Sequence, residues 1–146
     1  MENCDFLVDL KTKANTVTIE DFSKDGVKMQ VNLSGKINGK YQANHVETSE
    51  DVMKMDGTME WESRAVETTD EGDVIYVNGN GVGEQLEGTE MSIKGELLYL
   101  TNSPRLSWLN NSKAYIEGVT DTRKGEAEFK IYALTEAPEE VAIPAM

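Results

Sequence analysis

The stretch from Gly57 to Gly83, GTMEWESRAVETTDEGDVIYVNGNGVG, decides the fold class. From Thr58 to Glu67 small or apolar residues alternate with polar ones, the period-two pattern of a strand with one apolar face. One face carries Met59, Trp61, Ser63 and Ala65, and the other carries Thr58, Glu60, Glu62 and Arg64. Turn residues follow at 70–72, and β-forming residues resume at 74–77. The stretch therefore predicts two strands joined by a tight turn.

Short strand-like segments separated by turn signals fill the rest of the chain. They are Phe6–Leu10, Thr16–Glu20, Val27–Leu33, Tyr41–Val46, Val52–Met55, Met91–Thr101, Lys113–Glu117 and Ala127–Leu134. Asn38-Gly39 and Asp56-Gly57 are favoured hairpin turns. Two places allow a helix: a single turn at Ser49–Lys54 and a short 3₁₀ turn within Ser103–Asn111.

This pattern predicts an all-β chain of about eight to ten strands with almost no helix, either a sandwich or a barrel. We favour a single antiparallel barrel, because closure removes the exposed strand edges that would otherwise aggregate. The barrel is expected to span residues 1–134. Residues 135–146, which include Pro138 and Pro144, are expected to form a flexible tail.

Composition narrows the classes of function. The chain of 146 residues carries a formal charge of -13, which disfavours binding to nucleic acids or to anionic membrane surfaces. Its N-terminus lacks the basic and apolar regions of a secretory signal, and no apolar run is long enough for a membrane helix, so we expect a cytoplasmic protein. Cys4 is the only cysteine, and we interpret it as a small apolar residue at the start of the first strand.

Two segments resemble a bacterial family catalogued as domain of unknown function 3237. The first is SRAVETTDEGDVIYVNGNG at 63–81, and the second is SPRLSWLNNSKA at 103–114, followed by Lys130-Ile131-Tyr132. The order and spacing of these pieces agree with the family over most of the chain from Phe6 to Leu134. The chain departs from the family at QANHVETSEDVMKMDG, where a Gly-Gly-x-x-Trp-like segment is missing, and in a shorter loop before Ser103. The resemblance implies a closed, calycin-like barrel and no particular activity.

A set of aromatic and polar side chains could orient a ligand at a barrel mouth. The predicted ligand-binding residues are Trp61, Arg64, Tyr76, Tyr99, Trp108 and Asn110. For each of these aromatic residues taken alone we favour a structural role: Trp108 and Leu109 would plug one end of the barrel, and the tyrosines would be half-buried strand residues. Asn110 could merely cap its loop. Arg64 marks a binding site for an anion only if it points into the barrel; on the outer face it would make ordinary ion pairs.

Few residues suggest catalysis. His45 is the only histidine and could act as a general base, but no activated Ser or Cys partner is visible, so we assign no catalytic residue. The acidic groups Glu47, Glu50 and Asp51 and Asp70, Glu71 and Asp73 do not match a calcium loop, and we interpret both as solvated turns. The glycine-rich segments lack the features of a phosphate loop. No metal or organic cofactor is expected.

Three hypotheses remain for the function. The first is a barrel that binds a small hydrophobic or carboxylate ligand. The second is a cyclase or isomerase that uses Arg64, Tyr76 or His45 on a hydrophobic substrate, so whether the protein is an enzyme is left open. The third is a protein that works through self-association, with Val74 and Leu98 facing outward and a homodimer as the expected state.

Overall fold

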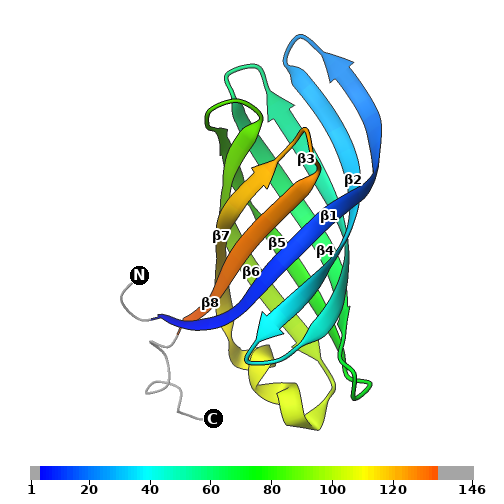
Figure 1. The fold of residues 1–146 in the computed structure, drawn as a ribbon, viewed down its shortest axis with the longest axis vertical. Helices are drawn as coiled ribbons and strands as arrows, with labels where there is room; N and C mark the ends of the chain where they lie inside the picture. Colours follow the sequence, from blue (N-terminus) through cyan, green and yellow to red (C-terminus); the bar gives the residue numbers. More distant parts are fainter. Residues whose placement is uncertain (1–3, 135–146) are drawn as a thin grey trace.

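Eight strands pair in the order in which they follow one another, and the last pairs with the first, so the sheet closes into a barrel (Figure 1). The computed structural model describes residues 4–134; the tail expected at 135–146 lies outside the described residues. The strands are β1 (Cys4–Ser23), β2 (Gly26–Gly39), β3 (Ala43–Lys54), β4 (Thr58–Thr68), β5 (Val74–Gln85), β6 (Glu90–Thr101), β7 (Lys113–Asp121) and β8 (Glu126–Leu134). A 3₁₀ helix, η1 (Pro104–Asn111), lies between β6 and β7. The prediction of a single antiparallel barrel is confirmed.

Several strand boundaries differ from the sequence prediction. The two strands expected at Phe6–Leu10 and Thr16–Glu20 form one continuous strand, β1. Its pairing with β2 shifts register at two bulges, after Ala14 and after Ile19. The helical turn expected at Ser49–Lys54 is wrong, because these residues belong to β3 and pair with β2 and β4. In both places pairing with neighbouring strands outweighs weak local propensity. The hairpin at Asp56-Gly57 and the 3₁₀ turn are confirmed.

The apolar face predicted for β4 lines the inside of the barrel. Three residues of this face, Met59, Trp61 and Ala65, are buried. The residues between them in sequence face outward, because side chains alternate between the two faces of a strand. Trp61 lies in register with Gly81 on β5, which in turn pairs with Gly95 on β6. A Cβ atom at Gly81 or Gly95 would lie 2.8 or 2.6 Å from Trp61 Cζ2. The two glycines thus make room for the indole against the barrel wall.

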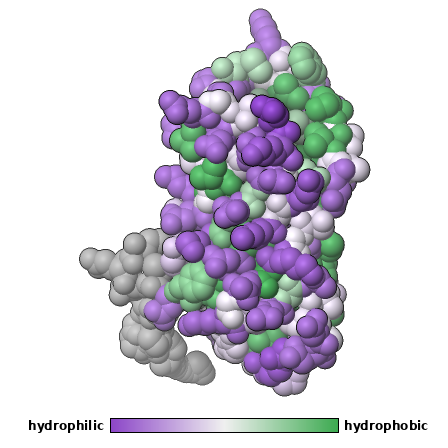
Figure 2. All heavy atoms as spheres, viewed as in Figure 1, coloured by the Kyte–Doolittle hydropathy of each residue, from purple (hydrophilic) through white to green (hydrophobic). Residues whose placement is uncertain are grey.

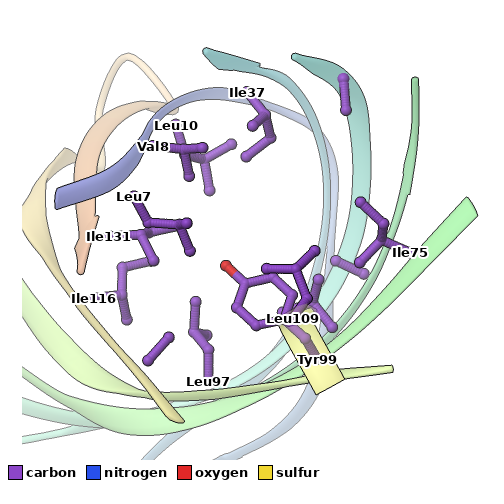
Figure 3. Packing of buried hydrophobic residues seen from close by; sticks show 14 of the residues in the cluster. Leu7, Val8, Leu10, Ile37, Ile75, Leu97, Tyr99, Leu109, Ile116 and Ile131 are labelled. Atoms are coloured by element: carbon purple, nitrogen blue, oxygen red, sulfur yellow. The ribbon is translucent and has the colours of Figure 1, made fainter. Parts of the chain in front are cut away.

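One end of the barrel is closed by η1. Its Leu106 and Leu109 are buried, and Figure 3 shows Leu109 beside the ring of Tyr99, among aliphatic side chains from the surrounding strands. This cluster includes Leu7, Ile75 and Ile131, each at most 1% exposed. Burial of such side chains contributes about 1.5–3 kcal/mol each, so the closed end supplies much of the stability of the barrel.

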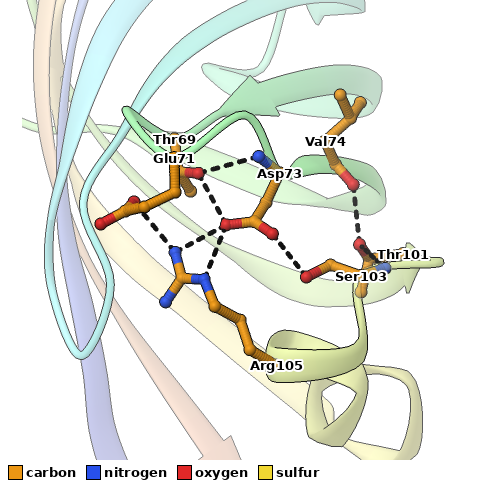
Figure 4. Close-up of polar contacts among 7 residues, drawn as sticks. All are labelled: Thr69, Glu71, Asp73, Val74, Thr101, Ser103 and Arg105. Atoms are coloured by element: carbon orange, nitrogen blue, oxygen red, sulfur yellow. Dashed lines mark hydrogen bonds and ion pairs between the residues drawn. The ribbon is translucent and has the colours of Figure 1, made fainter.

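Asp73 ties the closing helix to the turn between β4 and β5 (Figure 4). Its carboxylate accepts hydrogen bonds from the hydroxyls of Ser103 and Thr69, at 2.6 and 2.8 Å, and from Nε of Arg105 at 2.9 Å. Arg105 also pairs with Glu71 at 3.0 Å. The hydrogen bond from Ser103, followed by those from Thr69 and Arg105, lowers the pKa of Asp73. The interpretation of this acidic segment as a merely solvated turn therefore needs correction at Asp73.

The other end of the barrel carries the tips of the hairpins, and β1 and β2 extend beyond their neighbours there (Figure 1). The pairing of β1 with β8 stops at Lys13, so Val17, Ile19 and Phe22 pair only with β2. These three side chains are 52–77% exposed. Figure 2 shows hydrophobic side chains gathered over this hairpin, at the upper right, while polar side chains cover most of the remaining visible face. Among the described residues no helix is long and apolar enough to cross a membrane.

Candidate functional site

The barrel encloses a cavity of about 300 Å³ lined by inward-facing side chains from all its walls. Its lining reaches Val17 on β1 and Thr122 and Gly125 beside the β7–β8 turn, so it extends toward the end opposite η1. A second space of about 910 Å³ shares Leu10, Met59, Ile93 and Phe129 with it, but many of its other lining residues, such as Lys11, Lys94 and Lys130, are exposed, so we treat it as separate from the cavity. An eight-stranded barrel is just wide enough to hold one small ligand.

A chain of hydrogen bonds runs along the lumen side of β3 and β4. The Tyr41 hydroxyl donates to Glu67 Oε1 at 2.5 Å, and Glu67 Oε2 lies 2.9 Å from His45 Nδ1. The other ring nitrogen, His45 Nε2, lies 2.8 Å from Glu47 Oε1. The His45 and Glu67 side chains are 4% and 1% exposed, whereas that of Glu47 is 17% exposed. The chain of hydrogen bonds thus connects a fully buried carboxylate with a partly exposed one, and both line the cavity.

Both neighbouring carboxylates favour the charged form of His45. Burial alone lowers the pKa of its imidazole, but the hydrogen bonds to Glu47 and Glu67 outweigh burial and raise the pKa to about 9. At neutral pH both ring nitrogens therefore carry protons and donate to the two carboxylates. Burial, followed by the nearby charge of Glu67, raises the pKa of Tyr99 well above its usual value, so this phenol stays neutral.

Asp51 is a further carboxylate in the lumen. It lies on β3 directly opposite Trp61 on β4, and its Oδ1 accepts a hydrogen bond from the Ser49 hydroxyl at 2.6 Å. Burial raises the pKa of Asp51 to about 6, and the charges of Glu47 and Glu50 act in the same direction. A carboxyl group with this pKa can accept or release a proton near neutral pH.

Two buried hydroxyls find no hydrogen-bond partner among residues 4–134. They are Oγ1 of Thr12, which lines the cavity, and the hydroxyl of Tyr99. Figure 3 shows the Tyr99 hydroxyl pointing toward the middle of the lumen at its closed end. Buried polar groups normally have a partner, so the Thr12 hydroxyl, which lines the cavity, is suited to a water molecule or to a polar group of a ligand.

The structure separates the residues that the sequence suggested for ligand binding. Trp61 and Tyr99 point into the barrel, 6% and 6% exposed. Arg64 lies on the outer face of β4, and Tyr76 and Trp108 are 54% and 41% exposed. Asn110 binds both backbone groups of Thr101 at 2.8 Å, through its Oδ1 and its Nδ2. It thereby fastens η1 to the end of β6, as expected of a residue that caps its loop.

The hypothesised catalytic trio therefore does not meet at one place. His45 lies inside the barrel, whereas Arg64 and Tyr76 are exposed on its surface. Acid–base chemistry requires groups within hydrogen-bond reach of the reacting atoms. The groups that share the lumen with His45 are instead Glu47, Asp51 and Glu67.

The interpretation of Glu47 and Asp51 as parts of a solvated turn is wrong, since both are inward-facing strand residues that line the cavity. On β3 the usual pattern is inverted: Val46 faces outward and is 56% exposed, while His45 and its acidic neighbours face inward. The sequence does alternate along this strand, with Ala43, His45, Glu47, Ser49 and Asp51 on one face. Such alternation predicts a strand, but it does not show which face lies inside the barrel.

Comparisons with known proteins support the fold. The chain is similar to a protein of unknown function from Clostridium acetobutylicum, with a TM-score of 0.80 and 16% identity over 90% of this chain and 99% of the other. A β-barrel-like protein from Acinetobacter baumannii gives a TM-score of 0.74 and 17% identity over 90% and 96% of the two chains. An enzyme from Penicillium herquei gives a TM-score of 0.70 and 20% identity over 90% and 93%.

No model of a protein family matches the sequence. No protein of curated function is detectably similar to it either. The similarity to solved structures is thus a similarity of fold, shared with bacterial barrel proteins of unknown function. Membership of the domain of unknown function 3237 family stays a prediction.

Proposed function

We propose that the protein binds one small, largely apolar molecule in the lumen of its barrel. The observation that carries this proposal is the lined cavity of about 300 Å³ beside Trp61. Small-molecule sites span roughly 300–1,000 Å³ and combine apolar walls with a few polar groups. The walls of this lumen are mostly aliphatic or aromatic, and its polar groups are concentrated on β3 and the facing side of β4.

The mouth of the barrel suits an apolar ligand. The exposed side chains of Val17, Ile19 and Phe22 line the inner side of the β1–β2 hairpin, from which the lumen continues inward. Exposed apolar patches of this kind mark sites where apolar molecules are recognised. A ligand that enters along this hairpin would remain in contact with apolar surface until it reaches the cavity.

The test is a titration with the uncharged fluorophore N-phenyl-1-naphthylamine, whose emission rises in apolar surroundings. The wild-type protein should bind it saturably, with one site per chain. The substitution Ala65→Leu adds bulk to the buried wall of the cavity and should weaken binding. The matched control, Arg64→Ala, changes the neighbouring residue on the outer face and should leave binding unchanged. Equal binding by both variants would place the fluorophore outside the lumen and contradict the proposal.

A row of apolar side chains on the outer face favours a second role, self-association. Val46, Val66, Tyr76 and Leu100 lie in direct register across β3, β4, β5 and β6. Val46, Tyr76 and Leu100 are 54–66% exposed, and Leu98 on the same face of β6 is 63% exposed. We propose that a second copy of the chain covers this row, because a two-fold axis lets the same surface serve both partners.

Sedimentation velocity tests this role. The wild-type protein should sediment as a homodimer at micromolar concentration, and Leu100→Glu should shift it to a monomer. Glu60→Leu offers a matched control, because Glu60 is an exposed residue of β4 away from the apolar row. A wild-type monomer at high micromolar concentration would exclude a dimer of functional strength.

A further inference from the structure

The charged groups of the lumen are strongly unbalanced. Three carboxylates, those of Glu47, Asp51 and Glu67, line the cavity together with one imidazolium, that of His45. Among the described residues that line this cavity, none is lysine or arginine. The imidazolium is already bonded on both sides to Glu47 and Glu67, so Asp51 has no cationic partner.

Asp51 is also short of hydrogen bonds. Within the described chain its carboxylate accepts one side-chain hydrogen bond, from Ser49 to Oδ1. An ionised carboxylate can accept about four, and burying one without partners is costly. A ligand that brings positive charge and N–H donors would remove both deficits.

Trp61 adds a second element to the same place. It is the residue directly opposite Asp51 in the β3–β4 ladder, so the two Cβ atoms lie roughly 4.5–5.5 Å apart on the inner face. Its ring atom Cζ2 lies against Gly81 and Gly95, its Nε1 donates a hydrogen bond to the carbonyl oxygen of Val82 at 3.3 Å, and the side chain lines the cavity. Tryptophan offers the most favourable aromatic face for a cation.

We infer that the lumen selects an organic cation, an apolar amine whose ammonium group is held by the Asp51 carboxylate and the face of Trp61. This inference rests on the proposed binding function and specifies the class of ligand. The ammonium group would donate to the free Oδ2 of Asp51, while the apolar body would fill the lumen among its aliphatic walls. The charges of Glu47 and Glu67 would add to the attraction at longer range.

A bare metal ion fits this place less well. Within residues 4–134 no group of three or more His, Cys, Asp or Glu side chains is arranged to hold a metal. One carboxylate beside an aromatic ring and an apolar space instead matches the combined charge and shape of an amine.

The experiment compares three ligands with the same alkyl chain, n-octylammonium, octan-1-ol and octanoate, as competitors of N-phenyl-1-naphthylamine. Competition restricts the comparison to the lumen, because amines held only by the acidic surface would not displace the fluorophore. At about pH 7.5 the amine should compete at least about tenfold better than the alcohol, the difference that one charge-assisted hydrogen bond makes. Octanoate should compete most weakly.

Two lumen variants and one control identify the residues responsible. Asp51→Asn should reduce the preference for the amine over the alcohol to nearly one, and Trp61→Leu should reduce it several-fold. Glu62→Gln removes the same unit of charge from the exposed face of β4 and should leave the preference unchanged. If a lumen variant fails to fold, the comparison of the three ligands on the wild-type protein tests the inference by itself.

The possible failures are distinguishable. If the alcohol or octanoate competes as well as the amine, the inference about charge is overturned while binding in the lumen stands. If neither the fluorophore nor any of the three ligands binds, the proposed function itself is overturned, and the inference with it.

Discussion

His45 on β3 lies directly opposite Glu67 on β4, and 2.9 Å separates His45 Nδ1 from Glu67 Oε2. Both side chains are almost completely buried. Such a pair is costly to desolvate, and its hydrogen bonds must be complete for the cost to be offset. Here the bonds from Tyr41 to Glu67 and from His45 to Glu47 complete them. The network therefore holds two adjacent strands together from inside the barrel.

Removing the histidine should destabilise the protein strongly. His45→Leu leaves the Glu67 carboxylate buried without its cation, and breaking such a pair costs about 3–5 kcal/mol. The free energy of unfolding from urea titration at pH 7 measures this loss. The double variant His45→Leu, Glu67→Leu should recover part of it, because no uncompensated charge remains. Glu62→Ala on the outer face should change stability by less than about 0.5 kcal/mol. If His45→Leu reduced the free energy of unfolding as little as Glu62→Ala does, the His45–Glu67 pair would not be stabilising the protein.

The same pair should make stability depend on pH in the alkaline range. The folded-state pKa of His45, about 9, is raised above its ordinary value of 6.5. Its contribution is therefore fully present below pH 6.5 and is lost as pH rises through about 9. We expect the wild-type protein to lose on the order of 3 kcal/mol across this window, and His45→Gln to lose much less. A wild-type stability that stays level from pH 6.5 to 9 would contradict the raised pKa.

Asp51 should show that a ligand-binding group can reduce stability. Its folded-state pKa, about 6, is raised above 3.8, so stability is lost as pH rises from about 4 to about 6. At pH 7 the buried charge remains as a cost. Asp51→Asn should therefore raise the free energy of unfolding at pH 7 by about 2 kcal/mol and flatten the dependence on pH between 4 and 6. Chemical unfolding of both proteins at pH 4.5 and pH 7 measures these differences in the free energy of unfolding. If Asp51→Asn were less stable than wild type at pH 7, the raised pKa of Asp51 would be contradicted.

The fold was predictable because the outward and inward faces of β4 differ plainly in polarity. Met59, Trp61 and Ala65 repeat with a period of two, and regular turn residues separate the strands. The same reasoning failed on β3, where the inward face carries the charges and Val46 and Val52 face outward. Periodicity indicates which residues share a face, but only closure of the barrel shows which face is inside.

The candidate site was predictable only in part for the same reason. Trp61 was identified because it lies on an apolar face, whereas Arg64 was ambiguous and lies outside. The partners of His45 come from three separate parts of the chain, at Tyr41, Glu47 and Glu67. Such proximity arises from the strand register, which the sequence alone does not specify.

Asp73 should control how firmly η1 closes its end of the barrel. Asp73→Ala removes the acceptor shared by Ser103, Thr69 and Arg105. We expect faster amide hydrogen exchange in residues 104–111 at neutral pH, with little change in β1 or β8. Since the pKa of Asp73 is lowered, its contribution is present above about pH 4 and is lost as pH falls through the folded-state pKa.

Glu71→Ala, which removes one contact of Arg105, is the matched control and should have a smaller effect. Equal exchange in both variants would show that Asp73 does not hold the helix.

Gly95 should be required for the position of Trp61. A Cβ atom there would lie 2.6 Å from Trp61 Cζ2 and 2.2 Å from the carbonyl oxygen of Asn80, so the ring and the strand must move. We expect Gly95→Ala to destabilise the protein by about 1–3 kcal/mol, the usual cost of overpacking. In a Trp108→Phe background, which leaves Trp61 as the single tryptophan, the fluorescence emission of Trp61 should shift and binding of octylammonium should weaken.

Gly88→Ala in the exposed β5–β6 turn is a contrasting control, because nothing lies within 4 Å of its added Cβ. That control carries the strain of a positive φ, so it can lose stability, but it should leave the Trp61 emission unchanged. An unshifted emission in Gly95→Ala would contradict the packing of the indole against this wall.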